Sequence, residues 1–156
     1  MSRIRLYPDP HLRSVCTPVV VFDAALRARA DEMLALMYEG YGRGLAAPQV
    51  GSDRYGARVF VMDAGWKETG NRAGRVFVNP EITWASDELA AFEEGCLSIP
   101  DQPRRIARPA EIALRWQDVT GARHEARFTG PEAVIIQHER DHLDGRLILD
   151  HPEVPE

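Results

Sequence analysis

The most constraining feature of the sequence is the segment 137–145, which reads QHERDHLDG. On a helix, His138 and His142 lie one turn apart on the same face, because residues four apart are neighbours there. Two imidazoles placed in this way can hold one divalent metal. Glu139, beside the first of them, can reach a water bound to that metal. The segment therefore predicts a metal site of the HExxH type.

The residues before and after the motif predict a buried helix. Thr129 and Glu132 form a candidate capping box, Pro131 suits a first turn, and Gly145 stands where helices commonly end. The run 133–136 is apolar on all sides, which indicates burial. An exposed helix with solvated His and Glu is the alternative interpretation. Burying these polar groups without a partner is costly, and a metal is the simplest partner.

Length and composition are those of one globular domain. The chain has 156 residues, of which 44% are hydrophobic and 28% charged. The net charge of −5 and the lack of a basic tract argue against DNA or anionic membranes as partners. No apolar run is long enough to cross a bilayer, and the first residues do not form a signal core. We expect one domain over residues 1–150, in the cytoplasm, with Cys16 and Cys96 as separate thiols.

The order of the predicted elements indicates an α+β fold. Asp23 is a candidate N-cap for a helix over 24–39 that ends at Gly40. Leu26, Ala30, Met33 and Met37 form its apolar stripe. Strands are predicted at 58–62, 75–78, 81–84 and 88–93, and a hairpin at 111–116 and 123–128. The predicted order is therefore one helix, then several antiparallel strands, then the motif helix.

Two histidines leave a catalytic metal one protein ligand short. A metalloprotease of the zincin type would take a downstream Glu or His, but only the fourteen residues 143–156 follow His142. Ile148 occupies the position at which the longer metzincin motif has its third His. The best remaining soft ligand is Cys96, because a thiolate with two imidazoles suits iron(II), zinc, cobalt or nickel.

Gln49 is the only polar side chain between Leu45 and Val50, so its amide needs a partner if it is buried. The surrounding glycine-rich stretch 42–51 lacks the features of a phosphate loop. This stretch is one of three segments that together resemble the signature motifs of the peptide deformylases. They are GRGLAAPQ at 42–49, EGCLS at 94–98 and QHERDHLDG at 137–145. Their order and spacing also match, and the resemblance covers nearly the whole chain.

The resemblance implies a peptide-deformylase-like α+β fold, with short antiparallel sheets packed around the buried HExxH helix. It implies that Cys96, His138 and His142 bind one divalent metal, iron(II) in the cell, which zinc, nickel or cobalt can replace. By the same comparison Glu139 is the general base and acid, and Gln49 and the Leu97 N–H are oxyanion donors. The residues implied to contact the substrate are Gly44, Arg43, Phe92 and Val134.

The family removes the formyl group from the formylmethionine at the N-terminus of new polypeptides and releases formate. The residue chemistry agrees with that reaction. A bound metal lowers the pKa of its water, so hydroxide can attack the formyl carbon near neutral pH. Glu139 accepts a proton from that water and returns it to the leaving amine. An oxyanion donor such as Gln49 is worth roughly 3–4 kcal/mol in comparable sites.

Several positions depart from the family pattern. Arg43 and Arg140 each stand where an apolar residue is usual, and a buried Arg140 would need a carboxylate. The resemblance pairs Asp141 with Arg108, and a solvated acid is the alternative.

We expect the tail 151–156 to be disordered. We also expect no C-terminal helix of the kind implicated in ribosome docking in this family, and at most a transient ribosome contact.

The sequence is compatible with two other functions. A deformylase-like hydrolase of another N-acylated peptide or amino acid is one, because Arg43 alters the entrance to the methionine pocket. A metal-binding paralogue without catalysis is the other, although the complete set of Cys96, His138, Glu139, His142 and Gln49 opposes it. A general endopeptidase is disfavoured by the missing downstream ligand.

Overall fold

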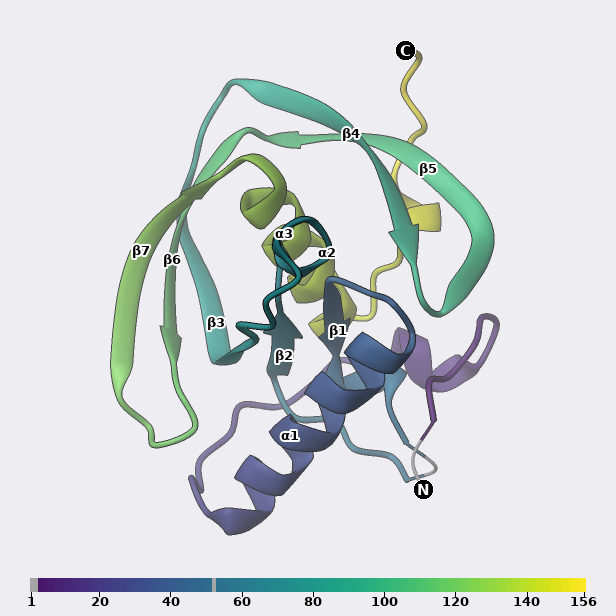
Figure 1. The fold of residues 1–156 in the computed structure, drawn as a ribbon. Coiled ribbons are helices and arrows are strands. Elements are labelled where there is room, and N and C mark those ends of the chain that lie inside the picture. The colour runs from purple at the N-terminus through teal and green to yellow at the C-terminus, as the bar shows by residue number, and fades with distance from the viewer. Residues whose placement is uncertain (1–2, 52) are drawn as a thin grey trace.

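The computed structural model describes residues 3–51 and 53–156 (Figure 1). Two long helices and seven strands organise this part of the chain, and a one-turn helix α2 (Trp66–Thr69) lies between β2 and β3. The main elements are α1 (Ala24–Glu39), β1 (Gly44–Ala46), β2 (Val59–Met62), β3 (Arg75–Ala85), β4 (Leu89–Cys96), β5 (Ile99–Pro109), β6 (Glu111–Gln117), β7 (Arg123–Thr129) and α3 (Gly130–Leu143). This is the expected α+β architecture.

The strands form two antiparallel sheets around α3. The larger sheet has the order β1-β2-β3-β6-β7, and β4 and β5 form a separate hairpin. Figure 1 shows α3 in the middle of the molecule, between the larger sheet and the β4–β5 hairpin. The helix that carries the motif is therefore enclosed by both sheets. In the described residues no helix has the length and apolar character needed to cross a bilayer.

The first helix has the predicted position. The Asp23 side chain accepts a hydrogen bond from the Leu26 N–H at 3.0 Å, and Gly40 follows the last helical residue. Leu26, Ala30, Met33 and Met37 are all buried, as the spacing of the apolar residues predicts. This face packs against β1 and β2, so α1 supports the strand that carries Gly44.

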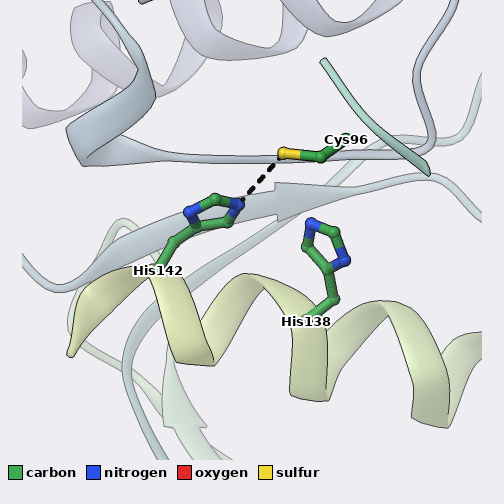
Figure 2. Close-up of side chains that lie close together, drawn as sticks. All are labelled: Cys96, His138 and His142. Carbon is green, nitrogen blue, oxygen red and sulfur yellow. Dashed lines mark hydrogen bonds between the residues drawn. The ribbon is translucent and has the colours of Figure 1, made fainter. Parts of the chain in front are cut away.

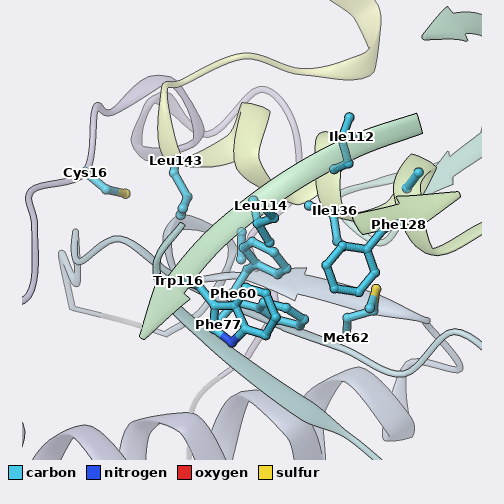
Figure 3. Packing of buried hydrophobic residues seen from close by; sticks show 12 residues of the cluster. Cys16, Phe60, Met62, Phe77, Ile112, Leu114, Trp116, Phe128, Ile136 and Leu143 are labelled. Carbon is cyan, nitrogen blue, oxygen red and sulfur yellow. The ribbon is translucent and has the colours of Figure 1, made fainter. Parts of the chain in front are cut away.

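An aromatic core fixes α3 against the larger sheet (Figure 3). Phe60 and Phe77 stack with ring centroids 4.7 Å apart, and Trp116 and Phe128 pack beside them. From α3, Ala133 and Ile136 are buried in the same cluster. The predicted burial of the motif helix is confirmed, because one face of α3 belongs to this core.

The strand predictions were incomplete. The segments 75–78 and 81–84 belong to one strand, β3, whose register with β6 shifts in two places. The arginine- and proline-rich strand β5 was not predicted, because it lacks a clear alternation of apolar residues. The predicted capping box is wrong. Thr129 precedes α3, but its side chain makes no capping hydrogen bond.

The tail also differs from the expectation. Residues 151–156 have no regular secondary structure, yet they lie along β5. The Val154 N–H donates to the Arg105 carbonyl at 2.9 Å, and the Arg104 Nε donates to the His151 carbonyl at 2.9 Å. One backbone carbonyl at the edge of β5 and the side chains of two of its arginines thus hold the tail, so a proline-rich composition does not leave it without contacts.

Candidate metal centre and its cleft

Cys96, His138 and His142 come together although they lie on two separate elements (Figure 2). Each offers a ligand atom, and these atoms all lie within 4.8 Å of one another. The Cys96 Sγ and His142 Nε2 are 3.5 Å apart. Two ligands of one tetrahedral zinc-type metal, with Zn–S and Zn–N bonds near 2.3 and 2.0 Å, stand about 3.5 Å apart. The three residues therefore fit a divalent metal.

The local folding of β4 explains the position of the thiol. Cys96 is the last residue of β4, where the chain turns back into β5, and the β4–β5 register shifts between Glu94 and Cys96. Burial alternates along this end of the strand, so Glu94 and Cys96 are both buried and Gly95 is exposed. The hairpin thus directs a carboxylate and a thiol toward α3.

Glu94 orients the first histidine. The His138 Nδ1 donates to the Glu94 Oε1 at 3.0 Å. This bond leaves Nε2 as the nitrogen that is free to bind a metal, an arrangement typical of metal-binding histidines. Arg108 in turn donates to both oxygens of Glu94, at 2.6 and 3.0 Å. The carboxylate is therefore held in one orientation from two sides.

The predicted pair between Asp141 and Arg108 is confirmed. The Arg108 Nη1 donates to the Asp141 Oδ2 at 3.0 Å, and both residues are buried. The alternative interpretation of Asp141 as a solvated acid is wrong. Sequence reasoning gave Glu94 no role, although a signal was present. Residues two apart share one face of a strand, and Glu94 stands two before Cys96.

The charges around the site favour a cation. Burial opposes a positive charge on His138, yet the pKa of this imidazole lies well above its usual value. The groups that raise it are the Glu139 carboxylate, the Cys96 sulfur and the Glu94 carboxylate. A divalent metal at this site would supply the positive charge that these three groups favour. Burial and the neighbouring His138 lower the pKa of His142, which keeps it in the neutral form that binds metal.

Glu139 is buried in an unusual environment. Its Oε2 lies 3.8 Å from the His138 Nε2, and its Oε1 has no hydrogen-bond partner among the described residues. Burial raises the pKa of Glu139 to about 7. A carboxyl with this pKa can both accept and return a proton near neutral pH. The group lies beside the ligands, where acid–base chemistry would be needed.

The buried Gln49 amide makes hydrogen bonds through both its oxygen and its nitrogen. It is 1% exposed, and its Oε1 accepts from the Ala46 N–H at 2.8 Å. Its Nε2 donates to the Ser98 Oγ at 3.0 Å and lies 3.5 Å from the Cys96 Sγ. The amide orientation is therefore fixed, with the NH₂ group directed toward the metal ligands.

One cleft of about 630 Å³ contains the remaining predicted residues. Gln49, Leu97 and Glu139 line it, as do Arg43, Gly44, Phe92 and Val134. Arg43 donates to both carboxylate oxygens of Glu68, at 2.9 and 2.6 Å, at the rim. Arg140 lies outside the cleft. It is half-buried, and no carboxylate of the described residues pairs with it.

Gly44 is expected to be necessary for the position of Glu139. A Cβ atom at this residue would lie 2.6 Å from the Glu139 Oε2 and 2.9 Å from the Ile135 Cγ2. Gly44→Ala should therefore displace the carboxylate. It should lower kcat/KM for any reaction that uses this carboxylate by about 10²-fold, since small displacements of reacting groups have effects of that size. Gly65→Ala is the control, because a Cβ there meets nothing within 4 Å. A Gly44→Ala value within threefold of the wild type would contradict the expectation.

Comparisons with known proteins agree on one family. The model of the polypeptide deformylase family matches residues 1–155. Peptide deformylases of Rhizorhabdus wittichii and Phenylobacterium zucineum are 46% and 47% identical, over 92% and 97% of this chain and 82% and 87% of their own lengths. The crystal structure of peptide deformylase from Thermotoga maritima is 38% identical, covers 99% of both chains and has a TM-score of 0.89.

Proposed function

The chain belongs to the peptide deformylase family and has peptide deformylase activity, and from that premise we propose how its residues carry out the reaction. The observation that carries the proposal is the Cys96–His138–His142 cluster with Glu139 beside it on one cleft. When bound there, a divalent metal supplies a hydroxide nucleophile near neutral pH. The substrate is the formylated N-terminus of a new polypeptide. We propose that the reaction takes place in the cytoplasm, with at most a transient contact with the ribosome.

Glu139 is the general base and then the general acid. Its carboxylate accepts the proton of the attacking water and returns it to the methionine amine as the bond to the formyl carbon breaks. Two features support this role. The pKa of about 7 suits proton exchange near neutral pH, and no hydrogen bond within the described residues holds the carboxylate through its buried Oε1.

Gln49 and the Leu97 N–H stabilise the charge that develops on the formyl oxygen. The Gln49 NH₂ group has one strong acceptor, Ser98, and a longer contact of 3.5 Å to the Cys96 sulfur. Donation to the formyl oxygen would replace the longer of these two contacts, the one to the Cys96 sulfur. No backbone acceptor among the described residues takes the Leu97 N–H. Both donors lie on the cleft that also contains Glu139.

The apolar wall of the cleft accepts the methionine side chain. Phe92 from β4 and Val134 from α3 face this space, and Gly44 allows the substrate backbone to approach the site. For the metal we propose iron(II), because the resemblance to the family implies it. Zinc, nickel or cobalt can replace it, because one thiolate and two imidazoles suit all four metals.

Formate release from formyl-Met-Ala-Ser, by protein of measured metal content, tests the proposed function. Acetyl-Met-Ala-Ser is measured beside it. Turnover of the formyl peptide alone supports the proposal. Turnover of the acetyl peptide with no action on the formyl peptide would favour a different N-acyl substrate. One bound metal per chain without turnover of either peptide would favour a non-catalytic role.

Arg43 is proposed to influence which residue follows the methionine. Its guanidinium is partly exposed at the rim and is paired with Glu68. Arg43→Leu should lower kcat/KM for formyl-Met-Glu-Ser relative to formyl-Met-Leu-Ser by up to about fivefold, since partly exposed charge pairs are worth at most about 1 kcal/mol. Glu68→Gln frees the guanidinium and should shift the same ratio in the opposite direction. An equal ratio in all three proteins would exclude this role.

A further inference from the structure

The tail brings a histidine into contact with the motif helix. The His151 imidazole is mostly buried, with 16% of its side chain exposed, and its Nε2 donates to the Asp141 Oδ2 at 2.8 Å. The backbone of the tail is held beside β5 by the bonds that Arg104 and Arg105 make to His151 and Val154. His151 is therefore fixed by its main chain and its side chain together.

The Asp141 oxygen that accepts from His151 also accepts from Arg108. From Arg108 the contacts continue to Glu94 and from Glu94 to the Nδ1 of His138, each through hydrogen bonds of 2.6 to 3.0 Å. Asp141, Arg108 and Glu94 are at most 8% exposed. One continuous network of charged groups thus joins the tail to a metal ligand.

The position of each member of this network depends on its neighbours. A buried carboxylate needs its full set of donors, because an unpaired buried charge is far less stable than a paired one. Without His151, Asp141 loses a donor at the outer end of the network and becomes more accessible to water. Arg108 is then shared less evenly between Asp141 and Glu94, and the orientation of the His138 ring is less tightly defined.

We propose that His151 is a positioning residue of the metal centre, which acts through Asp141, Arg108 and Glu94 on the orientation of His138. The proposal rests on the metal site of the proposed function but is independent of the substrate. Its test therefore measures metal retention and needs no turnover, so failure of the substrate assignment and failure of this proposal are distinguishable.

The test uses cobalt(II)-loaded protein and follows loss of the thiolate–cobalt absorption after addition of a chelator. His151→Ala should release cobalt about tenfold faster than the wild type, the lower end of the effects seen for groups that support metal ligands. His151→Gln should stay within twofold of the wild type, because its amide nitrogen replaces Nε2. His151→Asn, which replaces Nδ1 instead, should resemble the alanine variant. Release within twofold of the wild type in both His151→Ala and His151→Asn would overturn the proposal.

Two controls separate positioning from a general loosening of the tail. Glu153→Gln removes the long Arg104–Glu153 ion pair of 3.9 Å and should leave the release rate unchanged. In an Asp141→Asn background, His151→Ala should add little, because residues of one network are not additive. An undiminished tenfold effect in that background would show that His151 acts on the metal by another route. The pair of glutamine and asparagine variants keeps the test valid even if the alanine variant unfolds.

Discussion

Glu139→Gln is expected to lower kcat by about 10³-fold, the middle of the range for loss of a general acid–base group. The glutamine amide has nearly the same shape as the carboxylate but cannot accept the proton. The ligands Cys96, His138 and His142 are untouched, so the variant should keep one metal per chain. Formate release and metal content are measured on the same preparation.

Thermal unfolding adds a second result for the same variant. The wild-type carboxylate is 4% exposed and its Oε1 has no partner among the described residues. A neutral amide loses less solvation on burial than a carboxylate does. Glu139→Gln should therefore unfold at a temperature no lower than the wild type.

Activity of Glu139→Gln within tenfold of the wild type, in protein with full metal content, would show that Glu139 takes no part in the proton transfers.

Cys96→Ser is expected to lose the metal itself, and turnover with it. A serine hydroxyl at this position is a neutral, hard donor in place of a thiolate, so affinity for a borderline metal should fall by at least 10²-fold. Metal per chain after gel filtration, measured beside formate release, gives the result. The two quantities should fall together, in contrast to Glu139→Gln.

Cys16→Ser is the matched control for this loss. Cys16 is also buried, in the aromatic core cluster and away from the cleft, and burial raises the pKa of its thiol to about 11. Its replacement should lower the stability of the fold but leave one metal per chain. A Cys96→Ser protein that retained metal as well as Cys16→Ser does would exclude Cys96 as a ligand.

The sequence was most informative where a pattern is local. The four-residue spacing of His138 and His142, the apolar stripe of α1 and the Asp23 cap depend on helical geometry alone, and all have the predicted form. Strand β5 was missed because its core contacts come from few residues, among them Ile99 and Ile106, within an arginine-rich segment. Pairing with β4 stabilises it, and that pairing is a property of the hairpin rather than of the strand.

Around the metal centre, too, local motifs were predicted and contacts between distant segments were not. Cys96 and Glu139 were named from motifs, but the contacts of Glu94 with Arg108 and of Asp141 with His151 join segments whose spacing carries no periodic signal. The tail was predicted to be disordered from its prolines. Its actual position depends on a backbone carbonyl at the edge of β5 and on the side chains of Arg104 and Arg105, contacts that composition does not reveal.

The division of the ligands between the β4–β5 hairpin and α3 also bears on the order in which the protein matures. One ligand is residue 96 and the other two are residues 138 and 142, so the ribosome must add more than forty residues after the first before the set is complete. Because the two elements must dock before the donors converge, an unfinished or partly folded chain has no such site. The complete set of three ligands is therefore expected to bind metal only after the β4–β5 hairpin has docked on α3.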